Sequence, residues 1–467
     1  MVAQKQKVDF TQGKLFAKIF WFVLPIVVTN LLQTFYNAAD MMVVSLSSET
    51  NAVGAVGTTS SFIHLIVNVF IGFSVGANVV VARNIGAGDE MGKQKAIHTA
   101  LLIGLFFGIV GAGVGIAISR WVLTVMGTTG NLLDLAVKYT YFYFAGVPFL
   151  AVTNYLIAIF RAKGDSKTPL VVLSLAGLVN VGLNLLFVLA FKLSVEGVAL
   201  ATAIANLLSF IVLLIKLKKD GDFSVKHLKI DKKALKDIVF IGLPAALQGA
   251  IISISNILIQ SSIVTVNNNV CPENSTYQPV VNGCAAGSNL SAFVYTAQNA
   301  VYQGAITFTS QNMGANKPRR VYKIMGICCL LSTLFGLSLA ILIFLLRVPL
   351  LSLYGVPLGE VGSLEEIAFN AATTQLLFVC LPYFLCGIME VGSGALRGMG
   401  KSTLSMILML VGSCLLRVVW LLTVFPLKQT LEMVYICYPI TWLLTSIVMF
   451  ICAFAVIRKN IKYGGNG

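Results

Sequence analysis

Stretches of about twenty apolar residues recur along nearly the whole chain. A helix of about this length crosses the hydrocarbon core of a bilayer, and a helix also satisfies its own backbone hydrogen bonds there. The sequence therefore predicts twelve spanning helices, and the boundary at Lys192–Glu196 between two of them is the least distinct. Their expected ranges are 16–45, 57–82, 96–119, 132–160, 168–190, 195–215, 238–263, 290–312, 322–346, 368–395, 403–425 and 432–456.

The fold class predicted from these segments is an all-α integral membrane protein. Charged residues make up 11% of the chain, against about 25% in soluble domains. The mean hydropathy is +0.88. No long stretch of ordinary composition is left that could form a soluble catalytic domain. The short polar N-terminus does not have the pattern of a cleavable signal peptide.

The basic residues predict the orientation of the chain. With twelve spans both termini lie on one side, and that side carries 27 of the 33 Lys and Arg residues. Because cytoplasmic loops are enriched in Lys and Arg, we expect both termini in the cytoplasm and the protein in the cell membrane. The net charge of +15 does not favour nucleic-acid binding, since the lysines are dispersed over many short loops.

The chain also repeats itself. Leu24-Pro25 recurs as Leu243-Pro244, Asn84-Ile-Gly-Ala87 recurs as Asn312-Met-Gly-Ala315, and Arg161-Ala-Lys-Gly164 recurs as Arg397-Gly-Met-Gly400. Six spans in each half insert the same way up, which predicts a parallel repeat about an axis along the membrane normal. We therefore expect an N-terminal lobe at 1–215, a Lys-rich cytoplasmic linker at 216–236 and a C-terminal lobe at 237–467.

Asp40 is the residue that points most directly to a function. It lies near the end of the first apolar segment, where a carboxylate costs about 2.5–3.5 kcal/mol by insertion scales. Such residues usually face a cavity and bind an ion or a proton, which favours cation-coupled transport. The alternative is that Asp40 only ends the segment near the water interface.

Several motifs resemble the MATE family of multidrug and toxic compound extrusion transporters, most closely its DinF-like branch. They are Leu24-Pro25 with the following Leu32-to-Asp40 segment, Ser310-to-Ala315, Arg161-to-Pro169 and Leu396-to-Gly400. The resemblance covers about 15–456. It implies two six-helix lobes around a central cavity, alternating access, and export of amphipathic, often cationic organic compounds in exchange for protons or sodium. It also implies a transporter that is complete as a monomer and needs no cofactor.

The resemblance implies a cation-coupling site at Asp40, Asn180, Asn184 and Thr202. Asn180 and Asn184 are four residues apart and share a helix face, and their carbonyls with the Thr202 hydroxyl suit a hard cation. Alternatively, these three polar side chains only bond neighbouring helices. The family often has a second Asp at the position of Asn184. With one carboxylate, whose burial disfavours the charged form, we expect protons rather than sodium, although sodium at Asp40 stays open.

The second half carries its buried charges elsewhere. The position equivalent to Asp40 is Ile259, so the acid does not repeat. Glu390 and Arg417 lie within the tenth and eleventh spans, where unpaired charges are costly. Their simplest interpretation is a mutual ion pair, and a second coupling site is the alternative.

Aromatic and amide side chains suit flat cationic compounds through stacking and cation–π contact. Packing between helices is the other interpretation of each such residue. The candidates for the substrate cavity are Gln33, Tyr36, Met41, Tyr141 and Asn154 in the first half and Tyr295, Gln298, Asn299, Tyr302 and Gln303 in the second.

Cys271 and Cys284 fall in a polar insertion at 264–289 that the topology places outside the cell. An external pair could form a disulfide, but the spacing alone leaves the free thiols equally open. The other seven cysteines lie in spans and are interpreted as apolar packing residues.

The sequence does not favour an enzyme. The three histidines are scattered, no metal-ligand cluster occurs, and there is no Walker-type phosphate loop. A lipid-linked oligosaccharide flippase is the nearest rival, but it should hold pyrophosphate with several basic residues inside spans, and Arg417 is the only one. The parallel repeat also disfavours an ion channel.

Overall fold

The structure is a computed structural model that describes residues 10–47, 49, 52–270 and 278–464. These residues form helices and short turns, and no strand occurs among them. The contacts divide the chain into two compact units, 1–13 with 24–249 and 310–316, and 14–23 with 250–309 and 317–467.

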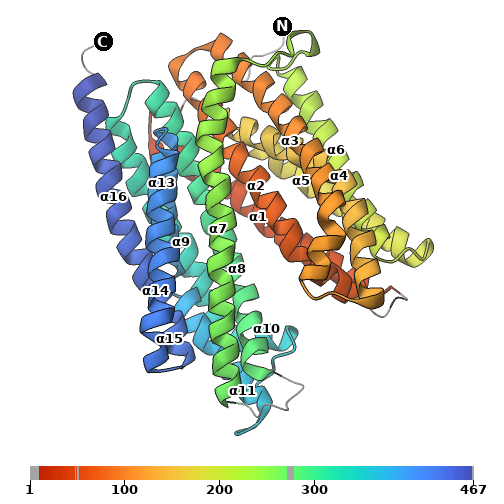
Figure 1. Ribbon diagram of the computed structural model, residues 1–467. Coiled ribbons are helices and arrows are strands. Elements are labelled where there is room, and N and C mark those ends of the chain that lie inside the picture. The colour runs from red at the N-terminus through yellow and green to blue at the C-terminus, as the bar shows by residue number, and fades with distance from the viewer. Residues whose placement is uncertain (1–9, 48, 50–51, 271–277, 465–467) are drawn as a thin grey trace. The chain divides into compact units, whose positions relative to one another are not determined.

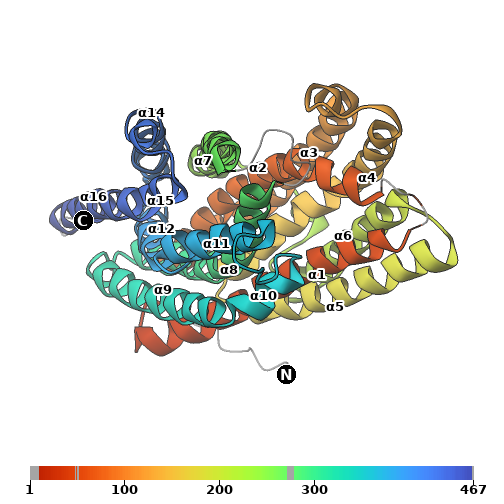
Figure 2. The same cartoon turned by 90° about the horizontal axis from the view of Figure 1, so that it is seen from below.

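The first half of the chain contains six long helices that match the first six predicted spans. Their bounds are α1 Leu15–Ser45, α2 Ala52–Ala87, α3 Glu90–Val125, α4 Gly130–Ala162, α5 Lys167–Leu185 and α6 Val195–Lys219. A π-helical turn, Leu186–Ala190, extends α5. In this unit α4 packs against α2, α3 and α6, and α5 packs against α6. Figure 2 shows α5 and α6 side by side, with α1 next to them.

The helices of the second half are interrupted more often. They are α7 Lys232–Val270, α8 Pro279–Gly314, α9 Arg319–Leu345, α10 Arg347–Leu353, α11 Leu364–Gln375, α12 Tyr383–Gly398, α13 Ser402–Met409, α14 Leu416–Thr423, α15 Leu431–Tyr435 and α16 Cys437–Gly464. A π-helical turn joins α11 to α12, and another joins α13 to α14. These joined pairs correspond to the tenth and eleventh predicted spans. In this unit α12 packs against α9 and α16.

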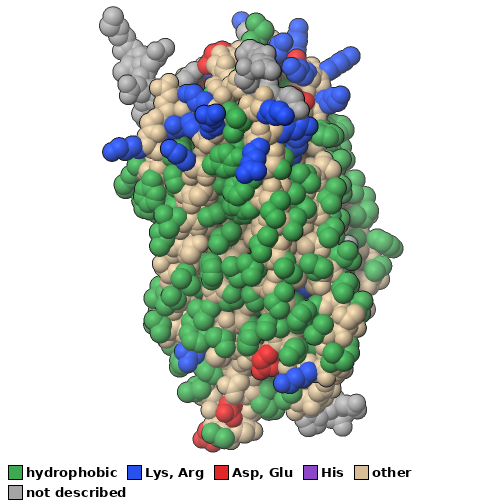
Figure 3. All heavy atoms as spheres, turned by 90° about the vertical axis from the view of Figure 1, so that its left-hand side faces the viewer, with side chains coloured by type: hydrophobic (Ala, Val, Ile, Leu, Met, Phe, Trp, Pro, Cys, Tyr) green, Lys and Arg blue, Asp and Glu red, His purple; other side chains and the backbone are tan. Residues whose placement is uncertain are grey.

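Eleven helices in the described parts of the chain are long and apolar enough to cross a membrane. The one predicted span outside these eleven is 290–312, which corresponds to α8, a helix of 36 residues with a more polar sequence. Figure 3 shows one face with hydrophobic side chains across its middle and Lys and Arg side chains gathered at one end. This distribution is the one expected for a protein surrounded by lipid.

Two repeated glycines explain how the ends of α2 and α8 come together. A Cβ atom on Gly86 would collide with the backbone of Gln311, and one on Gly314 would collide with the backbone of Arg83. Each glycine of the repeated motif thus lies against the other copy of that motif. Both contacts lie within the first compact unit, which includes 310–316.

The chain between α6 and α7, residues 220–231, is fixed to the first unit by buried ion pairs. Lys93 at the start of α3 lies 2.7 Å from Asp222, and Lys163 at the end of α4 lies 2.6 Å from Asp222 and 2.8 Å from Asp220. Lys216 also pairs with Asp220. Both Lys93 and Asp222 are less than 10% exposed. The predicted linker is therefore shorter than 216–236 and tightly held.

The acid dependence of stability should reveal this network. Burial alone would raise the pKa of Asp220, but its bonds to Lys163 and Lys216 more than offset this, and its pKa lies below the ordinary value. Stabilisation by Asp220 is then complete above the unfolded-state value of about 3.9 and is lost as the pH falls through the folded-state pKa. We expect Asp220→Asn to lower Tm by roughly 2–4 °C at neutral pH and by less below about pH 4. Thermal unfolding of the wild type and of Asp220→Asn from neutral pH to below pH 4 measures the difference in Tm. A difference that does not change with pH would contradict the prediction.

Candidate functional site

The four residues of the predicted cation site lie together in the first unit. Asp40 comes from α1, Asn180 and Asn184 from α5, and Thr202 from α6. Asn184 Nδ2 donates to Asp40 Oδ1 at 2.5 Å, and the amide groups of Asn180 and Asn184 lie 3.3 Å apart. The Asn180 amide is also 3.3 Å from Thr202 Oγ1. Three helices thus converge on one carboxylate.

The orientation of the Asn180 amide follows from its neighbours. With Nδ2 toward α1, it donates to Asp40 Oδ1 at 2.7 Å, and Oδ1 then accepts from Thr202 Oγ1 at 3.3 Å. In this orientation both asparagines donate to the same carboxylate oxygen. Asn184 Oδ1 is buried and has no hydrogen-bond partner, so one acceptor beside Asp40 remains unsatisfied. A buried acceptor of this kind is available to a proton donor or a cation.

Local sequence places these side chains where they meet. Asn180 and Asn184 are one helical turn apart and both are buried, so they form a continuous polar strip on α5. Tyr36 of α1 donates from its hydroxyl to the Ser174 carbonyl at 3.2 Å. A Cβ atom on Gly177 would collide with the Tyr36 ring, so this glycine allows α1 to lie close to α5.

Asp40 lies within α1, five residues before its end, and is half-buried. It therefore does not act as a helix-terminal residue. The described residues include no Lys or Arg within ion-pair distance of it, and its polar partners are neutral amides. Around the site, Val43, Val198 and Ala199 belong to a buried apolar cluster. A lone carboxylate with amide and hydroxyl groups in apolar surroundings can exchange a proton or hold a hard cation.

Two tyrosines near this site were missed by the sequence analysis. Tyr139 and Tyr143 of α4 are close enough to Asp40 to interact with it electrostatically, and Tyr139 is buried. Their spacing of four residues was the available signal, because it places both on one helix face. Tyr141, which the sequence analysis chose, points elsewhere and is 43% exposed.

The other candidate cavity residues of the first half have varied environments. Gln33 is exposed, and Met41 packs against the buried apolar cluster. Asn154 donates from Nδ2 to the carbonyl of Leu150 on its own helix, at 3.0 Å. Tyr36 has the structural contacts described above. A role for these four in substrate binding stays a prediction.

In the second half, some of the candidate cavity residues of α8 are buried in packing and others are exposed. Gln298 is buried against Gly336 and Gly387, and its amide has no hydrogen-bond partner. Gln303 is buried and Asn299 is half-buried. The ring of Tyr302 is buried and its hydroxyl accepts from Arg397, whereas Tyr295 is 40% exposed and lies near the Tyr383 ring.

The expected ion pair between Glu390 and Arg417 is absent from the described part of the chain. The Arg417 guanidinium lies over the Tyr438 ring, 4.0 Å from its centroid. Glu390 on α12 has Arg397 as its electrostatic partner, about two helical turns further along the same helix. Cation–π contact with an aromatic ring is thus what accommodates Arg417, so the interpretation as a mutual pair was wrong.

The proposed disulfide involves Cys271, which lies outside the described residues. Cys284 is buried within α8, so the helix includes part of what was expected to be an irregular insertion. The first part of that insertion, 264–270, belongs to α7.

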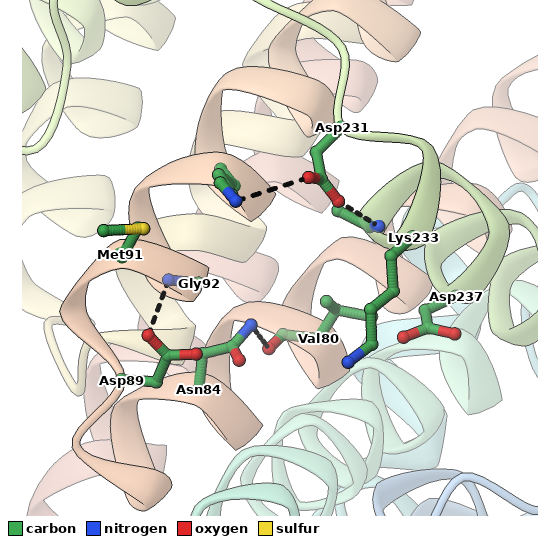
Figure 4. A pocket seen from close by; sticks show the side chains of 10 residues that line it. Val80, Asn84, Asp89, Met91, Gly92, Asp231, Lys233 and Asp237 are labelled. Carbon is green, nitrogen blue, oxygen red and sulfur yellow. Dashed lines mark hydrogen bonds and ion pairs between the residues drawn. The ribbon is translucent and has the colours of Figure 1, made fainter.

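A separate pocket lies between the starts of α3 and α7, with a volume of about 200 Å³. Figure 4 shows Asp89 and Asn84 on one side and Asp231, Lys233 and Asp237 on the other. None of the four residues at Asp40 lines it. Within the described residues there is no group of three His, Cys, Asp or Glu side chains arranged to hold a metal ion.

Comparison with known proteins decides the family. The MatE family model matches residues 25–186 and 244–422, which together make up most of the chain. The protein belongs to the MATE family. The two matched segments correspond to the two halves of the repeat, and the matches do not distinguish the DinF-like branch.

Relatives of this MATE protein have bacterial sources. The probable multidrug resistance protein YoeA of Bacillus subtilis is 27% identical over 391 residues, covering 81% of this chain and 80% of YoeA. The FAD transporter of Shewanella oneidensis is 24% identical, with 80% of each chain covered. An outward-facing structure of a multidrug resistance MATE family transporter has a TM-score of 0.86 at 20% identity, with 98% of this chain and 99% of that chain covered.

These findings confirm the predicted fold class and the prediction that the protein is a transporter and not an enzyme. MATE proteins are multi-pass membrane proteins that handle small molecules and need no cofactor.

Proposed function

We propose that this MATE protein is a secondary active exporter of amphipathic, often cationic organic compounds, driven by inward movement of protons through Asp40. The single observation that carries the proposal is the convergence of Asn180 and Asn184 on a half-buried carboxylate within a spanning helix. An acid at such a position is costly unless it takes part in ion or proton movement. The multidrug relatives support the substrate class.

Proton coupling is favoured over sodium coupling by the count of charges at the site. Asp40 is the only acid among the four residues, and both amides present donor groups to it. A sodium ion would need those donors to turn away and expose their carbonyl oxygens. A proton needs only the Asp40 carboxylate as its acceptor, and the protonated carboxyl group can donate a hydrogen bond to a neighbouring oxygen such as Asn184 Oδ1, which is buried and unsatisfied.

The same proposal includes the orientation and the working unit. The excess of Lys and Arg on one side supports cytoplasmic termini. A single chain contains both halves of the repeat, which supports function as a monomer.

The experiment is efflux of ethidium from cells that express the protein, compared with cells that carry an empty vector. We expect efflux that stops with a protonophore and continues when sodium is removed. Efflux that stops only when sodium is removed would show that sodium, and not the proton, is the coupling ion. An absence of efflux under every gradient would contradict the multidrug proposal.

A second acid at the site should change the ion. In Asn184→Asp, a carboxylate replaces the amide that now donates to Asp40, so two negative charges share one site. We expect efflux that is stimulated about fivefold or more by sodium, because two carboxylates with the Asn180 and Thr202 oxygens suit a hard cation. Dye efflux from proteoliposomes with sodium or choline outside measures this, and the matched control is Asn460→Asp on α16, a half-buried amide that bonds only the Val456 carbonyl of its own helix. Equal sodium responses in the two variants would contradict the assignment.

A further inference from the structure

We propose that the segment from Val225 to Lys233, between α6 and α7, is a docking surface for anionic phospholipid headgroups. The segment follows Lys219, the last residue of α6, and ends in the first turn of α7. Both helices are candidate membrane spans. The segment is therefore only a few residues along the chain from two membrane spans, which keeps its side chains close to the bilayer surface. The electric field of anionic lipids acts there.

The backbone of this segment is held against the first unit. His98 of α3 stacks on Phe223, and its Nε2 accepts from the Ser224 N–H at 3.2 Å. Thr99 Oγ1 accepts from the Asp231 N–H at 3.0 Å. Two contacts with α3 thus bracket the residues between them and fix which way the chain runs (Figure 1).

The acidic residues between α6 and α7 form ion pairs with lysines of the neighbouring helices. Asp220 and Asp222 pair with Lys163, and Asp222 also pairs with Lys93. Asp231 lies 3.7 Å from Lys95 and accepts from the Ala234 N–H at 2.9 Å, which caps α7. None of these three acids is left to neutralise the lysines between Val225 and Lys233, and Asp237, further along α7, interacts electrostatically with Arg83.

The outward side chains are basic and aliphatic. Val225 is 68% exposed and Ile230 is 55% exposed. The lysines between and after them are exposed and form no ion pair with any described residue: Lys226, Lys229, Lys232 and Lys233. Alternating lysines and aliphatic residues suit the boundary between headgroups and acyl chains.

The start of α7 adds to the argument. Its first turn contains Lys232 and Lys233 and no acid, although positive charges are unfavourable at a helix N-terminus. Figure 4 shows Lys233 extending into the pocket beside Asp237, without an ion pair. A headgroup phosphate near this turn would offset the repulsion between the two lysines and the N-terminus of α7.

A lipid fits better than a protein partner. Three exposed aliphatic residues, Val225, Leu228 and Ile230, offer far less apolar area than the roughly 800 Å² that each partner buries in a stable protein interface. The position beside two spanning helices instead brings the segment to the membrane without a separate binding event.

The test is hydrogen–deuterium exchange of this segment with the full-length protein in nanodiscs. One disc contains phosphatidylcholine alone and the other also contains about 30 mol% phosphatidylglycerol. We expect exchange about tenfold slower in the anionic disc, with the difference lost at about 0.5 M salt. The double variant K226Q/K229Q should lose most of the difference. The matched control R458Q/K459Q, which removes two charges from α16, should keep it.

Equal exchange in the two discs, or an unchanged difference in K226Q/K229Q, would overturn the proposal. Protection by added polyglutamate but not by phosphatidylglycerol would also overturn it, in favour of an acidic protein partner. Thermal unfolding of both double variants checks that the fold is retained. Because this readout requires no transport, it can fail or succeed separately from the proposed function.

Discussion

Replacing Asp40 with Asn should abolish proton-driven efflux while the protein remains folded. The amide has nearly the same shape as the carboxylate, but it cannot take up or release a proton. Asn180 and Asn184 would face a neutral group in place of a charge. We expect efflux to fall by about tenfold or more, to the level of cells without the protein.

The control for this variant is Asp134→Asn. Asp134 is an exposed acid that pairs with Arg120 at 3.2 Å, and its side chain is 66% exposed. The control should export dye at the normal rate, since exposed ion pairs contribute little. Dye efflux is measured for both variants at equal amounts of membrane protein. Efflux by Asp40→Asn at the rate of the control would show that coupling does not pass through this carboxylate.

The second large effect is expected where the repeated glycines meet. In Gly86→Ala the new methyl group would lie 2.7 Å from the carbonyl carbon of Gln311, and in Gly314→Ala it would lie 2.8 Å from that of Arg83. Backbone cannot yield as a flexible side chain does, so α2 and α8 must separate. We expect the free energy of unfolding of each variant to fall by about 3 kcal/mol and its Tm to fall by about 6–12 °C.

Gly113→Ala on α3 is the matched control for the glycine variants. No atom lies within 4 Å of a Cβ at Gly113, and the residue is exposed. Alanine is a better helix former than glycine by about 1 kcal/mol, so this variant should melt at the same or a slightly higher temperature. Glycine-to-alanine substitution is therefore expected to lower Tm at the contact and to leave it unchanged or raise it slightly at Gly113. A Gly86→Ala protein that melts like Gly113→Ala would contradict the contact between the repeats.

The repeat and the spans could be predicted because they depend on local patterns. The predicted spans at 57–82 and 96–119 lie inside the longer helices α2 and α3, and the predicted span at 195–215 begins where α6 begins. The span predicted at 290–312 was too short at its start, because α8 begins at Pro279 with polar residues that the hydropathy pattern does not detect. The π-helical turns in the tenth and eleventh spans depend on packing and have no signal in the sequence.

The site shows the same division. Asp40 and the pair Asn180 and Asn184 could be found because buried polar groups stand out in apolar segments. The approach of Tyr139 could not be separated from packing, since an aromatic residue is common in either role. The position of Arg417 over Tyr438 depends on which helix faces meet, so charge alone led to the wrong partner.

The most direct test of the central claim is proton movement in proteoliposomes that contain the purified protein. A pH-sensitive dye is trapped inside, and an organic cation that the protein exports is added outside without any other gradient. We predict that the wild-type protein releases protons in exchange for the cation, and that Asp40→Asn releases none while Asp134→Asn behaves like the wild type. Proton release by Asp40→Asn at the wild-type rate would contradict the account.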